Sequence, residues 1–261
     1  MPSSIAAQLY TVRDHTTTID DIARTCQRVR AMGYEAVEAA ALGPHDVAAL
    51  ARILGDNGLA CVCSHADLDD MVQESARCAD YHAALGCTFA AIGGFGFGGC
   101  PTDQWRKFID KYNVAAVTMQ EAGIRIGYHN HYQEWIRNVD GIRPIDLLIR
   151  DLHPAAWIEL DTYWVAHAGG EPTDWIRRIA DSGSPDLPRL PCVHVKDMQM
   201  DKEGTRIMCE VGSGNLHWSG ILDACRAAGT RWHIVERDHG ALDPFESLEV
   251  SLAQLKAMGL E

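Results

Sequence analysis

Short apolar runs alternate with longer amphipathic segments along the whole chain. Eight such runs, each of four to six residues, have the length typical of buried β-strands. They are residues 5–10, 36–40, 60–64, 88–92, 124–128, 156–160, 192–195 and 232–235. The segments between them carry apolar residues at helical spacing. The clearest begins at Thr18, a good N-cap residue, and ends at Gly33.

The alternation predicts an α/β protein built as a closed barrel. The other predicted helices are 45–57, 68–85, 102–122, 144–152, 173–179, 218–228 and 244–258. Eight strands in strict alternation with about eight helices favour a (β/α)8 barrel over an open parallel sheet. An open sheet would need a glycine-rich phosphate turn after an early strand, whereas the irregular glycine cluster 93–99 follows the fourth. A length of 261 residues suits one barrel domain spanning 1–261.

Composition indicates which kinds of partner are excluded and in which cellular compartment we expect the protein. A net charge of −13, with no basic patch, argues against a nucleic-acid partner. The chain contains neither a signal sequence nor a long apolar stretch, so we expect no membrane partner. Nine scattered cysteines, of which only Cys61 and Cys63 are close and would share one strand face, are interpreted as reduced core thiols. We therefore expect a cytoplasmic protein.

Four residues of types that bind metals lie at or beyond the ends of late strands. Asp161 follows the sixth strand, His194 lies in the seventh and Glu236 follows the eighth. Glu134 comes a few residues after the fifth. All strands of such a barrel end on one face, and carboxylates and imidazoles ligate divalent metals. We predict a metal site at these four residues, although Asp161 alone is equally typical of a helix cap.

Three further residues are candidates for the chemistry. The segment after the fifth strand carries His129 and His131, and imidazoles titrate near neutral pH, so these two are the predicted base and acid. The alternative is that they only hydrogen-bond neighbouring loops. Lys196 follows His194 by two positions and faces the same side of the strand. It is expected either to stabilise negative charge on a substrate or to lie solvated at the rim.

Other residues near strand ends are expected to line a substrate pocket. They are Gln8, Tyr10, Glu38, His65, Trp164, His167 and Arg237. Trp164 would offer an apolar face to a sugar ring or pack within its own loop. Arg237 would bind substrate or neutralise the neighbouring Glu236.

Seven segments resemble the xylose-isomerase-like barrel superfamily of sugar isomerases, epimerases and dehydratases. They are QLYTVRD from Gln8, GYEAVE from Gly33, YHNH from Tyr128, ELDTYWVAHAGGEP from Glu159, HVKDM from His194, EVGSG from Glu210 and IVERD from Ile234. The resemblance implies one divalent metal, manganese first, with cobalt, magnesium or zinc as alternatives. It implies a Glu, Asp, His, Glu ligand set, in which Asp161, His194 and Glu236 match the last three.

The fourth ligand departs from the pattern of this superfamily. Many relatives carry a Glu at the end of strand five, where this chain has His129, as in a branch resembling inosose dehydratases and enzymes that act on 3-keto sugars. Either His129 ligates the metal, or Glu134 reaches back to do so and frees the histidines for proton transfer.

The resemblance implies a divalent-metal-dependent isomerase or epimerase. Its substrate would be an unphosphorylated keto sugar or related polyol, with proton abstraction next to a carbonyl through a metal-stabilised enediolate. The alternative is a dehydratase or lyase acting on an inosose or 3-keto sugar at the same site. An abasic-site endonuclease, which the net charge disfavours, and a metal-free sugar-binding barrel are further alternatives. Exposed helices of such barrels often pair, which makes a homo-oligomer a further expectation.

Overall fold

The eight predicted strands close into one parallel barrel. The computed structural model describes residues 4–97, 99–138 and 140–261. Around the barrel the strands follow the order β1-β10-β7-β6-β5-β4-β3-β2. Their bounds are β1 Ile5–Gln8, β2 Ala36–Ala39, β3 Ala60–His65, β4 Phe89–Ile92, β5 Arg125–His129, β6 Trp157–Asp161, β7 Cys192–Val195 and β10 Trp232–Val235. The predicted (β/α)8 barrel is confirmed.

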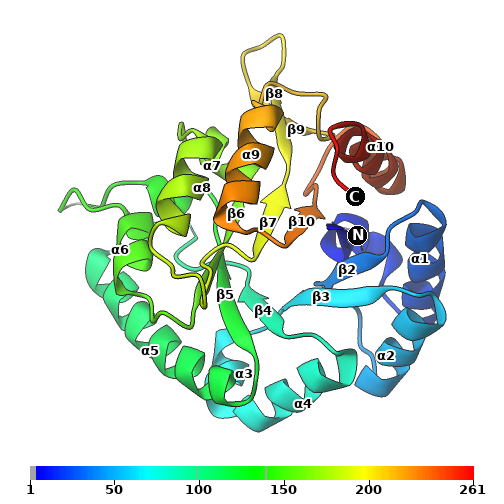
Figure 1. Cartoon of the computed structure of the whole chain (residues 1–261), viewed down its shortest axis with the longest axis horizontal. Helices are drawn as coiled ribbons and strands as arrows, with labels where there is room; N and C mark the ends of the chain where they lie inside the picture. Colours follow the sequence, from blue (N-terminus) through cyan, green and yellow to red (C-terminus); the bar gives the residue numbers. More distant parts are fainter. Residues whose placement is uncertain (1–3, 98, 139) are drawn as a thin grey trace.

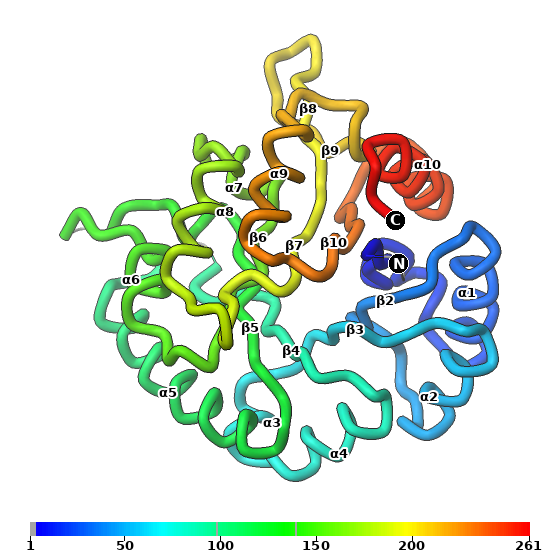
Figure 2. The backbone as a smooth tube through the Cα atoms, viewed as in Figure 1, coloured from blue at the N-terminus to red at the C-terminus, as the bar shows by residue number. Residues whose placement is uncertain are grey.

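Helices surround the barrel as an outer ring (Figure 1). They are α1 Ile19–Ala31, α2 Val47–Asp56, α3 Leu68–Gln73, α4 Ser75–Leu85, α5 Thr102–Glu121, α6 Pro144–Asp151, α7 Thr162–His167, α8 Pro172–Ala180, α9 Trp218–Ala228 and α10 Pro244–Ala257. The backbone trace brings the two ends of the chain close together beside α10 (Figure 2). The Ser4 hydroxyl donates to the Glu261 carbonyl at 3.0 Å, which links the N-terminal segment to the end of the chain.

Helix α1 shows how the local sequence sets an element. The Thr18 hydroxyl accepts a hydrogen bond from the Asp21 N–H, and the Asp21 carboxylate accepts one from the Thr18 N–H. This capping box satisfies two N–H groups that no helical carbonyl can reach. Ile22, Cys26 and Val29, at spacings of four and three, form the buried face against the barrel. The predicted start of this helix is confirmed.

Four local features differ from the sequence prediction. The helix expected over 68–85 is two helices, because Glu74 has a non-helical backbone (φ −125°, ψ 37°). Strand β1 ends at Gln8 and the chain continues as a 3-10 helix, Leu9–His15. A short helix, α7, directly follows β6 and is capped by the Asp161 carboxylate. The loop after β7 contains an antiparallel hairpin of β8 Asp197–Met200 and β9 Arg206–Cys209.

A register irregularity places two cysteines of β3 in different cores. Val37 of β2 pairs with Cys61 and the next residue, Glu38, pairs with Cys63, so β3 contains one extra residue. Cys61 packs in the core between the barrel and the helices, whereas Cys63 packs inside the barrel. The prediction that both share one face is therefore wrong. All nine cysteines are unpaired.

Small and large residues interlock at the floor of the barrel. The interior cluster consists of Ala6, Ala36, Val62, Cys63, Ala91, Trp157, Cys192 and Ile234, all buried. The Trp157 ring crosses to β5, where a Cβ on Gly127 would lie 2.3 Å from it. Gly127 is therefore required by the indole that fills the floor. Across the described ranges, none of the helices is both long and apolar enough to pass through a bilayer.

Replacing Gly127 with Ala is predicted to destabilise the barrel. The added methyl group cannot avoid the Trp157 ring, and overpacking of this kind costs about 1–3 kcal/mol. Gly55→Ala is the matched control, because Gly55 lies in α2 with no atom within 4 Å of its added Cβ. That control should gain roughly 0.5–1 kcal/mol from helix propensity. Urea unfolding checks both values, and equal stabilities for the two variants would contradict this packing account.

Acid sensitivity is predicted from His233 in β10. Burial lowers the pKa of His233 to about 4, so the folded protein keeps this imidazole neutral. Below about pH 6.5 the unfolded chain takes up a proton that the folded chain does not. Stability should therefore fall as the pH drops from about 6.5 to about 4, by up to roughly 3 kcal/mol. His233→Leu should lack this acid-induced loss of stability. The difference between the unfolding free energies of wild type and variant, measured across that pH range, gives the size of the loss.

Candidate metal centre

A layer of charged side chains lies directly above the apolar floor, inside the barrel. Alternate residues of a strand face the same side, so the inward position two residues after Trp157 is Glu159 and the next is Asp161. On β7 the same step leads from Cys192 to His194. The inward charged residues belong to β2, β3, β5, β6, β7 and β10 or directly follow these strands, and they are Glu38, His65, His129, Glu159, Asp161, His194, Lys196 and Glu236. The centre is built where the parallel strands end.

Four of these residues form a ligand group. Donor atoms of His129, Asp161, His194 and Glu236 all lie within 4.8 Å of one another, and all four residues are buried. The Nδ1 of His194 lies 2.7 Å from Oε2 of Glu236. The Nε2 of His129 lies 3.9 Å from Oδ2 of Asp161. The structure thus brings together three of the four predicted metal ligands.

Glu134 lies outside this group. The 3-10 turn Gln133–Trp135 folds its carboxylate back onto β5, where Oε1 accepts from the Tyr128 hydroxyl at 2.5 Å. Its Oε2 accepts from the His131 N–H at 2.9 Å. Burial raises the pKa of Glu134 to about 7, against the opposing effect of these hydrogen bonds. Of the two residues proposed for the fourth ligand, the structure places His129 in the group and Glu134 apart from it.

A second group shares His194 and contains one residue that the sequence analysis missed. Donor atoms of Glu38, His65, Glu159 and His194 also lie within 4.8 Å of one another. Nε2 of His194 lies 2.6 Å from Oε2 of Glu38, and Nε2 of His65 lies 3.1 Å from Oε2 of Glu159. The available signal for Glu159 was a charged residue in an apolar strand, two positions before Asp161 and therefore on its face.

Neighbouring carboxylates favour the protonated form of the histidines that lie between them. Burial alone would lower the pKa of His65, but Glu38 and Glu159 raise it to about 10. For His194 the opposing effects are burial, which lowers the pKa, and its carboxylate neighbours, which hold it well above the usual range. The same positive neighbours, together with the hydrogen bonds they donate, lower the pKa of Glu38 to about 2 despite its burial.

Lys196 is a buried member of the centre. Its Nζ lies 3.0 Å from Oδ2 of Asp161, 2.7 Å from Oε2 of Glu236 and 2.8 Å from Oδ1 of Asp238. The side chain is 1% exposed, so it is not the solvated rim lysine that was one alternative. Burial opposes its charge, but the three carboxylates hold the pKa of Lys196 well above its usual range.

Several of the predicted lining residues lie around this centre. The His131 ring lies 4.9 Å from the ring of His129 and 5.3 Å from that of Trp164. Trp164 in turn lies 5.3 Å from His167, so these rings form one aromatic wall. On the opposite side Gln8 is fully buried at the end of β1, its Oε1 accepting from the Tyr10 N–H.

Arg237 points away from the centre, contrary to its prediction as a substrate-binding residue. Its guanidinium lies 2.7 Å from Oε1 of Glu210 and donates to the Leu242 carbonyl at 2.6 Å. The side chain of Arg237 also does not pair with Glu236. The reason is strand alternation: Glu236 faces into the barrel, so the next residue faces outward.

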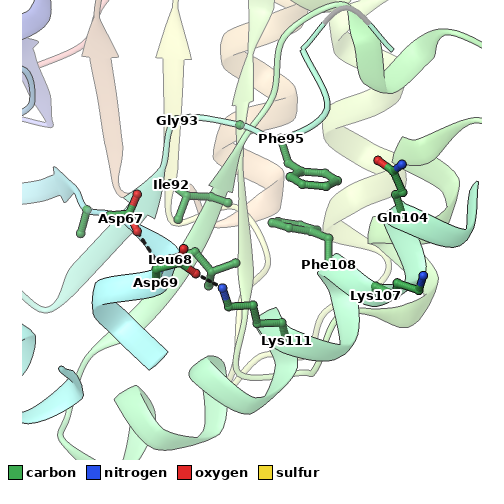
Figure 3. A pocket seen from close by; sticks show the side chains of 12 residues that line it. Asp67, Leu68, Asp69, Ile92, Gly93, Phe95, Gln104, Lys107, Phe108 and Lys111 are labelled. Carbon is green, nitrogen blue, oxygen red and sulfur yellow. Dashed lines mark hydrogen bonds and ion pairs between the residues drawn. The ribbon is translucent and has the colours of Figure 1, made fainter. Parts of the chain in front are cut away.

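Two clefts adjoin the centre beside β3 and β4. One of about 540 Å³ lies between α3 and α5, where Phe95 and Phe108 stack with ring centroids 4.3 Å apart (Figure 3). Gly93 lines this cleft and lies next to the centre, because a Cβ added to Gly93 would lie 3.5 Å from Nδ1 of His65. The other, of about 730 Å³, is lined by His65, α3 and α4. Both clefts border the centre at His65 or its neighbour Ala66.

The donor set of the first group fits a divalent metal. It offers two carboxylates and two imidazoles, the ligands that Mn²⁺, Co²⁺ and Zn²⁺ accept in proteins. Nδ1 of His129 is buried without a hydrogen-bond partner, and Oδ2 of Asp161, which forms ion pairs with Lys196 and His129, accepts no hydrogen bond. Buried polar atoms are usually satisfied, and a metal is one way to satisfy them. Fold and centre together define a (β/α)8 barrel protein with a carboxylate–imidazole centre at the carboxyl ends of its strands.

Comparison with known proteins places the chain in a family. The family model of the xylose isomerase-like TIM barrel matches residues 26–258, so the chain belongs to this family. No curated protein matches the chain.

Solved structures of several family-like barrels are similar to this fold. A sugar phosphate isomerase/epimerase from Parabacteroides distasonis has a TM-score of 0.81 at 20% identity, over 99% of this chain and 95% of that chain. A xylose isomerase-like TIM barrel protein from Mycobacterium smegmatis, in complex with magnesium, has a TM-score of 0.72 at 14% identity, over 98% and 97%. A probable 3-DHS dehydratase from Bacillus anthracis has a TM-score of 0.69 at 13% identity, over 97% and 98%. At these identities the similarity shows the fold.

Glu38→Gln is predicted to weaken metal binding without unfolding the protein. If His194 binds an ion through Nδ1, its Nε2–H donates to Glu38, which orients the ring and increases its basicity. Loss of such an outer carboxylate typically weakens metal affinity by about 10–100-fold. Electron paramagnetic resonance of free Mn²⁺ during titration measures the change. Glu249→Gln, on the exposed face of α10, should bind like wild type, and equal affinity in the Glu38 variant would contradict the prediction.

Proposed function

We propose that this protein is a divalent-metal-dependent isomerase or epimerase acting on a keto sugar or related polyol. The observation that carries the proposal is the buried group of His129, Asp161, His194 and Glu236 at the carboxyl ends of the barrel strands. Membership of the xylose isomerase-like family supports it. The reaction would be proton transfer at a carbon next to a carbonyl.

We assign the metal ligands to this group, with His129 in place of Glu134. A divalent ion held there would polarise a carbonyl and an adjacent hydroxyl of the substrate, which makes the neighbouring C–H acidic. Manganese is the proposed ion, and cobalt, magnesium and zinc are alternatives. Magnesium is the ion bound by the related barrel from Mycobacterium smegmatis.

His131 is the proposed base. Burial lowers the pKa of His131 to about 3, so at neutral pH its imidazole is in the neutral form that a general base requires. Its Nδ1 is buried without a hydrogen-bond partner, and its ring lies against both His129 and Trp164. The hydrogen bond from its backbone N–H to Glu134 fixes the loop that carries it. Glu134, with a pKa of about 7, lies next to it as a group able to exchange protons near neutral pH.

Two further features would serve the substrate. The Lys196 ammonium remains charged among Asp161, Glu236 and Asp238, close enough to the centre to stabilise negative charge that develops on a substrate oxygen. The aromatic wall of His131, Trp164 and His167 offers an apolar surface to the C–H face of a sugar ring.

Dehydration of an inosose or 3-keto sugar is the second candidate. The same base would remove the proton, and an acid would then expel a β-hydroxyl instead of returning the proton to carbon. His129 at the strand-five position and the similarity in fold to a dehydratase favour dehydration.

An abasic-site endonuclease is disfavoured because a net charge of −13 opposes binding to a phosphate backbone. A small-molecule substrate, a cytoplasmic location and a homo-oligomer are further parts of this proposal.

Hydrogen–deuterium exchange at a substrate carbon tests the proposed function. Wild type with Mn²⁺ in D₂O should exchange a proton next to the carbonyl in at least one member of a panel of keto sugars and inososes, measured by NMR. His131→Ala should slow exchange by about 10²–10⁴-fold while still binding Mn²⁺. Asp161→Ala should lose both the ion and the exchange.

The controls separate this chemistry from a general loss of fold. Asp223→Asn removes an exposed carboxylate of α9 that pairs with Arg226, and it should exchange like wild type. Exchange in wild type that persists undiminished in Asp161→Ala would contradict the proposed centre. A new vinylic signal accompanying exchange would select the dehydratase over the isomerase.

A further inference from the structure

Beneath the proposed metal centre, two thiols and a carboxylate meet inside the barrel. Sγ of Cys63, Sγ of Cys192 and a carboxylate oxygen of Glu159 lie within 4.8 Å of one another. All three residues are fully buried. Cys63 comes from β3 and Cys192 from β7, and three strands separate these two on either side of the barrel. The thiols therefore approach each other from opposite walls.

The neighbours of the two thiols are the apolar side chains of the floor. The same interior cluster contains Ala6, Ala36 and Ala91, whose small side chains occupy strands β1, β2 and β4. Trp157 and Ile234 fill the remaining space. Small side chains on several strands allow the two sulfurs to reach toward the barrel interior, where Glu159 supplies an oxygen.

Glu159 connects the histidines of the metal centre with the thiol group below them. Its Oε2 faces upward, 3.1 Å from Nε2 of His65 and 3.4 Å from Nε2 of His194. Its Oε1 lies 3.9 Å from Sγ of Cys63. One carboxylate thus contributes an oxygen both to the metal centre above and to the thiol group below.

We propose that Cys63, Cys192 and Glu159 form a second metal site, selective for a thiophilic divalent cation such as Zn²⁺ or Cd²⁺. Zinc binds thiolate sulfur at about 2.3 Å and carboxylate oxygen at about 2.1 Å, so tetrahedral ligands are separated by roughly 3.6–3.8 Å. The Cys63–Glu159 separation of 3.9 Å is close to that value. The sulfur ligands distinguish this site from the upper one, which offers only oxygen and nitrogen and suits Mn²⁺ or Mg²⁺.

The chemistry of binding is a simple exchange of protons for a metal ion. Each thiol releases one proton as its sulfur binds, so the dication is neutralised by two thiolates while Glu159 adds a third ligand. No oxidant or reductant takes part. A bound ion would tie β3, β6 and β7 together across the barrel floor and hold Glu159 in place below the upper centre.

Cobalt titration of the metal-free, reduced protein tests this site through its absorption spectrum. Co²⁺ bound to thiolate has an intense near-ultraviolet charge-transfer band, which oxygen and nitrogen ligands do not produce. Wild type should develop this band, and Cys63→Ser and Cys192→Ser should each lose it. Cys61→Ser is the matched control, because Cys61 lies on the same strand but faces the outer core, and it should keep the band.

Two further measurements keep the test independent of the proposed function and of variant folding. Asp161→Ala, which removes a ligand of the upper group only, should keep the charge-transfer band. The ¹¹³Cd NMR shift of wild type loaded with Cd²⁺ should lie in the range of sulfur ligation, and this needs no variant. Co²⁺ binding without the band, together with a cadmium shift typical of oxygen and nitrogen ligands, would overturn the second site and leave the upper centre unaffected.

Discussion

The structure depends on mutual neutralisation of charges buried at the mouth of the barrel. Glu38, Glu159, Asp161 and Glu236 are all removed from water, and an isolated carboxylate in such a place would be very costly. His65, His194 and Lys196 lie between them at 2.6–3.4 Å. Each cation contacts at least two carboxylates, so the charges form one network. Removal of a single member would leave its partners buried with less opposite charge beside them.

The fold holds this charge network in place from below and from the sides. Below it, Trp157 packs against Gly127 and closes the floor, so the charged layer rests on a buried, closely packed base. Around it, backbone groups fix the ligands. Asn130 Oδ1 accepts from the Asp161 N–H, and the Asp161 carboxylate caps α7 through the Trp164 N–H. A centre held in this way is organised before a metal or substrate arrives, which is the condition for electrostatic catalysis.

The sequence predicts the barrel well because its strands and helices have different hydrophobic periods. The eight strands begin and end within two residues of the predicted apolar runs, and the Thr18 cap of α1 is where the pattern placed it. The bulge in β3 and the break at Glu74 were not predictable, since both depend on how neighbouring elements pack rather than on local propensity. The hairpin β8–β9 lies in a loop whose few alternating residues give no strong signal.

The site was predictable only in part, for a related reason. Asp161, His194 and Glu236 could be placed from strand ends, because all strands of the barrel finish on one face. Glu134 and His129 could not be ordered from the sequence, since the choice depends on the 3-10 turn that directs Glu134 to Tyr128. Glu159 was missed because a charged residue inside an apolar strand is unexpected until the interior of the barrel is known to be polar at that level.

Anomalous diffraction from a crystal soaked in Mn²⁺ tests the central claim most directly, because it locates the ion without any assay. The account predicts a manganese peak within coordination distance of His129, Asp161, His194 and Glu236. A peak beside Glu134, or a mouth that binds no manganese at saturating concentration, would contradict it.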